Sequence, residues 1–224
     1  MKQTVVFSGI ESEYSYQVAV AFSKLPDYVV YVLHGKGERT ITESDLNVIE
    51  IEERRRERLA DAMKQIETCQ GSIDMLIVSA GKHCLQDGKI TQKHNYEKLL
   101  AVIDENVIGN LEVVYAALEL MRKGNGKRIA FLTERESSIN LNKSVEDYGY
   151  MLSLAALNMM EKVLFNTFRA EGFTFRCFAC SNLEGISPEI YFRKNLCYDK
   201  DDAYIHSDEN RLVMRDGMLC ELSW

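Results

Sequence analysis

Short runs rich in β-branched residues alternate with longer amphipathic segments along this chain, and the alternation limits its fold more than any other feature. Strands separated by helices form right-handed βαβ units, whose strands lie parallel in one sheet. The predicted strands are residues 3–9, 27–33, 46–52, 73–81, 126–134 and 173–181, and the predicted helices are residues 15–24, 53–69, 99–123 and 149–172. The sequence therefore predicts a doubly wound α/β fold with three layers, as a single domain over residues 1–224.

The last part of the chain departs from this alternation. Residues 183–210 are polar and irregular, and they connect the sixth predicted strand to residues 211–224. In that final segment Asp216 and Gly217 form a turn signal between two short apolar runs. We expect an irregular region that resembles a substrate loop, followed by a short strand or hairpin.

Composition and charge exclude several classes of partner. Apolar residues make up 46% of the chain, and 34 acidic residues outnumber 27 basic ones, giving a net charge of −7. This balance argues against nucleic acid and anionic membranes as partners. No apolar run reaches the roughly 18 residues that would predict a membrane span, and the N-terminus has no signal-peptide pattern. We expect a cytoplasmic protein with no nucleic-acid and no membrane partner.

The six cysteines are scattered, and a disulfide framework is not expected in a chain without a signal peptide. Cys177 and Cys180 have the spacing of a redox motif, but they lie in a predicted strand, where residues i and i+3 face opposite sides. We interpret them as reduced cysteines that pack in the core. No second cysteine pair or histidine cluster completes a zinc site, so no metal is expected.

The most specific pattern is YGYMLSLAALNMMEKVL, at residues 148–164. It resembles the Tyr-x-x-Ser-Lys-Ala-Ala-Leu-Asn-Met run of the short-chain dehydrogenase/reductase family, with Tyr150 and Ser153 in register and Leu154 at the lysine position. Three more segments resemble the family in the same order: VSAG at residues 78–81, ENVIGN at 105–110 and GKRIAFLTERESS at 126–138. The terminal DGMLCELSW is similar to the ending of smaller members. The resemblance implies a Rossmann-like fold and, in an active member, an NAD or NADP cofactor.

The cofactor-binding positions that the resemblance implies are Ser8, Gly9, Glu13, Ser15, Ala80 and Gly81. The family typically has Thr-Gly-x-x-x-Gly-x-Gly after the first strand, where glycines give a tight turn and let the backbone approach the pyrophosphate. Here only Gly9 is kept. Glu13 adds a side chain and a negative charge where the phosphate would lie. In a second interpretation, Glu13 simply complements the dipole and the free N–H groups of the helix that begins there.

The catalytic positions that the resemblance implies are Tyr150, Asn106, Leu154 in place of the lysine, and either Glu134 or Ser137 in place of the serine. Spacing puts Glu134 at the serine position, whereas a different loop path would bring Ser137 inward. Loss of a cation and gain of an anion both raise the pKa of a tyrosine. A tyrosine with a pKa of about 10 or more is a poor base at neutral pH.

Changes in the phosphate loop, the lysine and the serine together favour a fold without the family's usual activity. Our leading hypothesis is a catalytically impaired protein that binds no cofactor and acts as a structural, regulatory or partner subunit. The alternative is an NAD(P)-dependent oxidoreductase of carbonyl or alcohol substrates with Tyr150 as acid/base, and a third reading uses Glu134 as base for another reaction. Residues 99–123 and 149–172 are apolar on more than one side. We therefore expect a homodimer or a hetero-oligomer with a related subunit.

Overall fold

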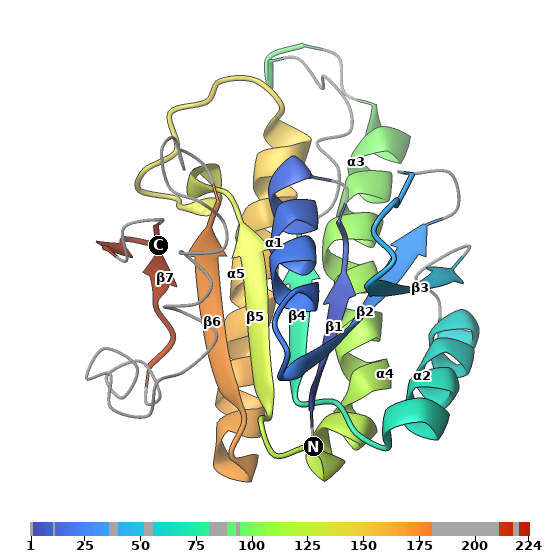
Figure 1. Ribbon diagram of the computed structural model, residues 1–224. Coiled ribbons are helices and arrows are strands. Elements are labelled where there is room, and N and C mark those ends of the chain that lie inside the picture. The colour runs from blue at the N-terminus through green and yellow to red at the C-terminus, as the bar shows by residue number, and fades with distance from the viewer. Residues whose placement is uncertain are drawn as a thin grey trace.

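The computed structural model describes residues 2–10, 12–35, 40–51, 56–80, 89–92, 95–180, 211–216 and 220–224. Within these residues the chain forms a sheet flanked by helices on both faces (Figure 1). The expected irregular region at residues 183–210, together with Gly81 and Gly217, lies outside the described residues.

The described strands form one sheet of eight in the order β3-β2-β1-β4-β5-β6-β7-β8. Their bounds are β1 Gln3–Ser8, β2 Tyr28–Gly35, β3 Leu46–Ile51, β4 Met75–Ser79, β5 Arg128–Thr133, β6 Thr174–Ala179, β7 Met214–Arg215 and β8 Glu221–Leu222. All neighbouring pairs are parallel except β7 with β8, which pair antiparallel. This is the predicted doubly wound, Rossmann-like sheet, and the closing hairpin is also confirmed. The chain reverses its winding direction between β1 and β4, where such folds hold ligands at the carboxyl ends of the strands.

The helices cover the two faces of the sheet unequally (Figure 1). Their bounds are α1 Glu13–Ser23, α2 Arg56–Gln70, α3 Tyr96–Ile103, α4 Asn110–Lys123 and α5 Tyr148–Phe168. The apolar side chains of α1 form a core with one face of the sheet, and those of α2, α4 and α5 form a larger core with the other face. Because both faces are covered, the central strands are buried along nearly their whole length.

The helix predicted at residues 99–123 begins earlier and is not uniform. It starts at Tyr96, and a π-helical turn, Asp104–Gly109, separates α3 from α4. In that turn the Asn110 side-chain amide donates to the backbone carbonyl of Asn106 at 2.8 Å and to that of Ser79 on β4 at 3.2 Å. The two bonds tie the start of α4 to the turn and to the sheet. Such turns are frequent at functional sites.

The amino ends of the central strands are fixed by Asp74, just before β4. Its buried carboxylate accepts hydrogen bonds from the backbone N–H groups of Thr4 at 2.9 Å, Asn125 at 2.9 Å and Gly126 at 3.2 Å. A Cβ on Gly126 would lie 2.4 Å from the Asp74 carbonyl oxygen, so the close approach requires glycine. One side chain therefore positions β1, β4 and the segment that leads into β5.

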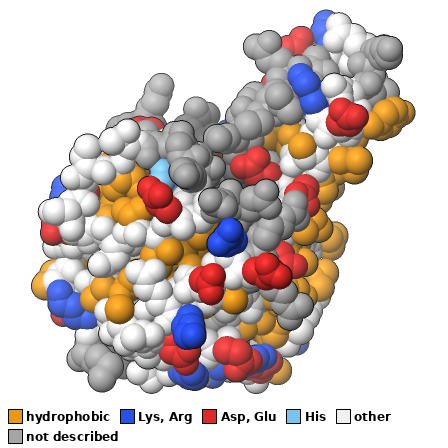
Figure 2. Space-filling view, turned by 90° about the vertical axis from the view of Figure 1, so that its right-hand side faces the viewer, with side chains coloured by type: hydrophobic (Ala, Val, Ile, Leu, Met, Phe, Trp, Pro, Cys, Tyr) orange, Lys and Arg blue, Asp and Glu red, His pale blue; other side chains and the backbone are white. Residues whose placement is uncertain are grey.

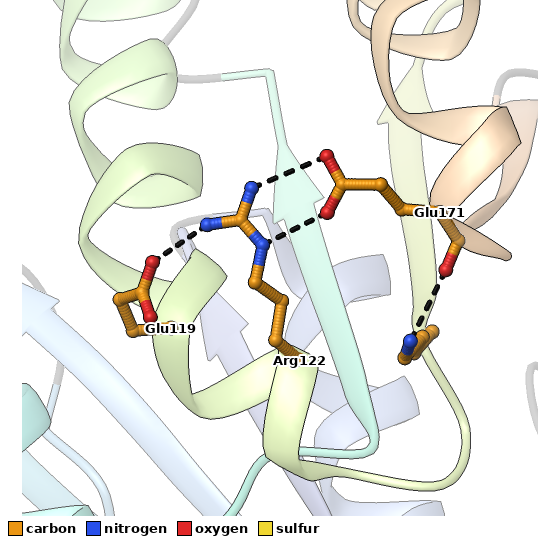
Figure 3. A network of polar contacts seen from close by, with 4 residues as sticks. Glu119, Arg122 and Glu171 are labelled. Carbon is orange, nitrogen blue, oxygen red and sulfur yellow. Dashed lines mark hydrogen bonds and ion pairs between the residues drawn. The ribbon is translucent and has the colours of Figure 1, made fainter.

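At the same edge of the sheet, an exposed ion-pair network joins α4 to the short 3-10 helix Arg169–Glu171 that follows α5 (Figure 3). The Arg122 guanidinium donates from Nε at 2.9 Å and from Nη2 at 3.3 Å to the Glu171 carboxylate, and from Nη1 at 2.6 Å to Glu119. Exposed pairs contribute little to stability, so we expect this network to add little to the free energy of unfolding. Among the described residues no helix has the length and hydropathy of a membrane span.

Candidate active site

The first loop turns tightly after β1 and delivers the chain into α1. Gly9 has φ +87°, a backbone conformation that favours glycine. The N-cap of α1 is Ser12, whose hydroxyl oxygen accepts a hydrogen bond from the Ser15 N–H at 3.0 Å. Ser15 is fully buried, and its hydroxyl donates to the Ser12 carbonyl at 3.1 Å. The start of α1 is therefore capped by Ser12, which belongs to the loop that precedes the helix.

Glu13 lies in the first turn of α1 with its side chain exposed. Its carboxylate accepts a hydrogen bond from Gln17 Nε2 at 2.7 Å, one turn further along the helix. The side chain that caps the helix is thus Ser12 and not the carboxylate of Glu13. An exposed carboxylate is well solvated, so its repulsion of a phosphate about 4 Å away falls to about 1 kcal/mol.

Tyr150, near the start of α5, is buried, with 2% of its surface exposed. Burial raises the pKa of Tyr150 well above its ordinary value, and the negative charge of Glu134 and a hydrogen bond with that carboxylate raise it further. Glu134 directly follows β5, at the carboxyl edge of the sheet. The two residues therefore meet where the resemblance puts the tyrosine and the serine, and Glu134 keeps Tyr150 protonated.

Leu154, at the position of the family's lysine, is fully buried. It forms a small apolar cluster with Tyr150 and with Val102 of α3, against which Ala80 and Met151 also pack. Ala80 follows β4 and is fixed by a hydrogen bond from its N–H to the Leu132 carbonyl at 2.7 Å. Within the part of the chain that the structure describes, the space beside the tyrosine ring is therefore filled by hydrocarbon, with no ammonium group in this cluster.

Asn106 is fully buried in the π-helical turn and contacts α5. Its Nδ2 donates to the Ser153 hydroxyl at 2.8 Å, and that hydroxyl donates to the Tyr150 carbonyl at 2.7 Å. The Asn106 Oδ1 is buried and accepts no hydrogen bond within the described structure. These bonds hold the α3–α4 junction against the helix that carries the tyrosine.

The Ser137 side chain points away from Tyr150, although Ser137 follows Glu134 by only three residues. It accepts a hydrogen bond at its hydroxyl from Asn158 Nδ2 at 3.0 Å and donates to Met214 Sδ at 3.5 Å. Asn158 is eight residues beyond Tyr150 on α5, which corresponds to about 12 Å along the helix. Of the two candidates for the serine position, Glu134 therefore lies beside Tyr150, and Ser137 faces β7.

A family model described as short chain dehydrogenase matches residues 17–185. The chain belongs to this family. The C-signal protein of Myxococcus xanthus is 34% identical to it over 107 residues, which is 47% of this chain and 62% of that protein. The match therefore spans less than two thirds of the relative's own length.

Solved structures share the fold of this short chain dehydrogenase. The carbonyl reductase Sniffer of D. melanogaster has a TM-score of 0.80 and 16% identity, with 100% of each chain covered. The RhlG/NADP active-site complex of Pseudomonas aeruginosa has a TM-score of 0.65 and 15% identity, with 79% of this chain and 71% of that chain covered. At this identity the likeness shows the fold.

Two residues that the sequence reasoning did not assign to the dehydrogenase site also lie near it. Cys180 directly follows β6 at the carboxyl edge, and the charge of Glu134 adds to burial in raising the pKa of its thiol. Tyr14 on α1 is largely buried, and burial raises its pKa. The available signal in the sequence was the position of Cys180 near the carboxyl end of the strand predicted at residues 173–181. Cys177, three residues earlier, faces α5 instead, and both cysteines are free thiols, as interpreted from the sequence.

Proposed function

We propose that this short chain dehydrogenase has lost the family's hydride-transfer chemistry and acts as a partner subunit. The observation that carries the proposal is Leu154, which is fully buried against Tyr150 and Val102. An active member would present an ammonium group at this place, to hold the nicotinamide ribose and to lower the tyrosine pKa. Leucine can do neither.

The protonation of Tyr150 supports the same conclusion. At its ordinary pKa of about 10, roughly one tyrosine in a thousand is ionised at pH 7. Burial and the neighbouring Glu134 raise the pKa of Tyr150 further, so its ionised fraction is smaller still. Acid–base catalysis is most effective when the pKa lies near the working pH. Tyr150 therefore serves as a packed, hydrogen-bonded aromatic residue of α5.

The residues present do not fit a dinucleotide well. Loss of one charge-assisted hydrogen bond at Leu154 costs about 1.5–3 kcal/mol, and the exposed carboxylate of Glu13 adds about 1 kcal/mol of repulsion. The sum corresponds to about a hundred- to a thousandfold loss of affinity. A micromolar site would weaken to the order of 0.1–1 mM. The Ser12 cap also occupies an N–H group at the helix start, where phosphates bind.

Exposed apolar side chains supply a surface for a partner. Tyr115 on α4 is 52% exposed, and Leu152 and Val163 on α5 are 53% and 55% exposed. Figure 2 shows hydrophobic side chains along its right-hand border, on the side where α4 and α5 cover the sheet. Since such patches mark interaction sites, we propose that this helix face binds a second copy or a related subunit.

The alternative is an NAD(P)-dependent carbonyl or alcohol oxidoreductase. The Asn106–Ser153–Tyr150 contacts favour it, because they keep the tyrosine-bearing helix firmly placed. The structurally similar carbonyl reductase and the NADP complex also favour it. In this reading the first loop would hold the phosphates by another route.

A reductase assay decides between the two readings. Purified protein is incubated with NADPH and a generic dicarbonyl, and Tyr150→Phe is compared with Tyr148→Phe, which lies on the same helix. We expect no turnover above background for any of the three proteins. Turnover by the wild type that Tyr150→Phe abolishes and Tyr148→Phe preserves would establish the oxidoreductase and overturn our proposal.

A further inference from the structure

A pocket of about 210 Å³ lies between α5 and the last described residues, apart from Tyr150. Its walls include Ser137, Ile139, Ala155, Asn158, Leu212 and Trp224. Neither Tyr150, Glu134, Asn106 nor Leu154 lines it. The pocket is therefore separate from the dehydrogenase cleft, and it is mostly apolar with a polar base.

Two polar groups at this base, the Ser137 hydroxyl and the Asn158 side-chain oxygen, contact sulfur atoms, which are weak hydrogen-bond partners. The Ser137 hydroxyl donates to Met214 Sδ at 3.5 Å, and thioether sulfur is a weak acceptor. Among the described residues, Asn158 Oδ1 accepts only a 3.9 Å contact from the Cys177 thiol, which is a weak donor. The wall of the pocket thus holds one hydrogen-bond donor and one acceptor whose present partners are poor.

Deeper on the same face of α5, Glu161 is fully buried beside Cys177. Neither of its carboxyl oxygens accepts a hydrogen bond from an oxygen or nitrogen atom in the described structure. Burial raises the pKa of Glu161 to about 8, although the neighbouring Cys177 thiol acts in the opposite direction. At neutral pH the acid is therefore mainly uncharged. Lys162 also lines the pocket, but it is exposed, and its Nζ lies 4.7 Å from the centre of the Phe165 ring.

We propose that this pocket binds a small neutral molecule with a ring-sized apolar body and one hydroxyl or amide group. A cavity of about 150 Å³ holds benzene, so the present volume accommodates a ring with a short polar substituent. The ligand oxygen would accept from the Ser137 hydroxyl, and the ligand hydrogen would be donated to Asn158 Oδ1. Ile139, Leu212 and Trp224 would contact the ring.

Trp224 is the sole tryptophan of the chain, so its fluorescence reports on this pocket directly. The probe is benzyl alcohol, titrated into the full-length protein, and we expect saturable quenching with a Kd on the order of 1 mM or tighter. Ala155→Leu narrows the pocket and should weaken binding at least about tenfold through overpacking. Asn166→Ala, at an exposed position on the same helix outside the pocket, should leave the affinity unchanged.

The polar contact is tested with the Ser137→Ala variant and with two ligands: benzyl alcohol, and toluene, which lacks the hydroxyl of the alcohol. Loss of one neutral hydrogen bond should weaken benzyl alcohol about three- to tenfold, and toluene should bind wild type and variant alike. A charged ligand class is tested with benzoate and benzylamine, both of which should bind more weakly than the alcohol.

Several results would overturn the proposal. Absence of saturation at about 10 mM benzyl alcohol would show that no such site exists. Equal affinity of benzyl alcohol for the wild type and for Ala155→Leu would show that the ligand binds at another site. Tighter binding of benzoate or benzylamine than of the alcohol would contradict a neutral ligand. Affinity that falls as the protein concentration rises would show that a second copy of the chain fills the pocket.

Discussion

Replacing Glu161 with glutamine should remove a large pH dependence from the stability of this protein. Burial raises the pKa of Glu161 to about 8, from an ordinary value of 4.5, and the nearby Cys177 thiol opposes this only in part. Because the folded-state pKa is raised, the folded state binds the proton more tightly than the unfolded chain. Stability is therefore full below the unfolded pKa, falls as pH rises between the two values, and levels off above about pH 8.

The magnitude follows from linkage. Each pH unit between the two pKa values costs about 1.4 kcal/mol, so the wild type should lose about 3 kcal/mol between pH 5 and pH 8 through this one group. Glutamine is uncharged at every pH in this range, so Glu161→Gln should not show this loss of stability. Urea unfolding of both proteins at pH 5 and pH 8 gives the four free energies needed, and effects of other titrating groups cancel in the difference.

Glu119→Gln is the matched control, since it removes an exposed carboxylate from α4. It should change stability by less than about 1 kcal/mol and keep the wild-type pH dependence. If Glu161→Gln instead loses as much stability as the wild type from pH 5 to pH 8, the carboxyl is not a buried neutral acid.

Three further predictions concern stability, assembly and the cleft. Asp74→Ala leaves three backbone N–H groups without their acceptor and should lower the free energy of unfolding by about 2–4 kcal/mol in urea; a loss under about 1 kcal/mol would contradict the role of this carboxylate. The wild type should scatter light as a dimer at about tens of micromolar, and Tyr115→Glu should shift it toward monomer; a wild type that stays at the 25.7 kDa chain mass would contradict this. Leu154→Lys alone should produce no reductase activity, whereas Glu13→Gly, Glu134→Ser and Leu154→Lys together should recover NADPH binding before turnover; activity from the single change would contradict our reading of the cleft.

The layered fold was predictable because each strand is a short apolar run and each helix a longer periodic one. The strands at residues 3–8 and 128–133 are buried along almost their whole length, so their runs are nearly continuous in the sequence. The closing hairpin was predictable from the Asp216–Gly217 turn signal; the described Asp216 side chain accepts from the Cys220 N–H at 2.9 Å. Helix ends were less certain, because caps depend on side-chain contacts.

The features that the sequence did not reveal depend on contacts between distant segments. At the end of the π-helical turn, the Asn110 amide bonds the Ser79 carbonyl, thirty-one residues earlier. The direction of Ser137 depends on Asn158 and Met214, which no local pattern brings together. Glu161 was the exception: it falls on the inward face of α5, seven residues after Leu154, so helical spacing alone could have identified it as a buried acid.

Calorimetric titration of the wild type with NADPH, repeated with NADH, tests the central claim most directly. The cleft carries Leu154 in an apolar cluster, Glu13 at the start of α1 and Glu134 against Tyr150. We predict that titrating about 50 μM protein with dinucleotide up to about 0.5 mM reveals no binding with a Kd below about 0.1 mM, since the expected affinity is of the order of 0.1–1 mM. Stoichiometric binding with a Kd of a few micromolar would contradict the account and establish that the first loop holds phosphate despite its carboxylate.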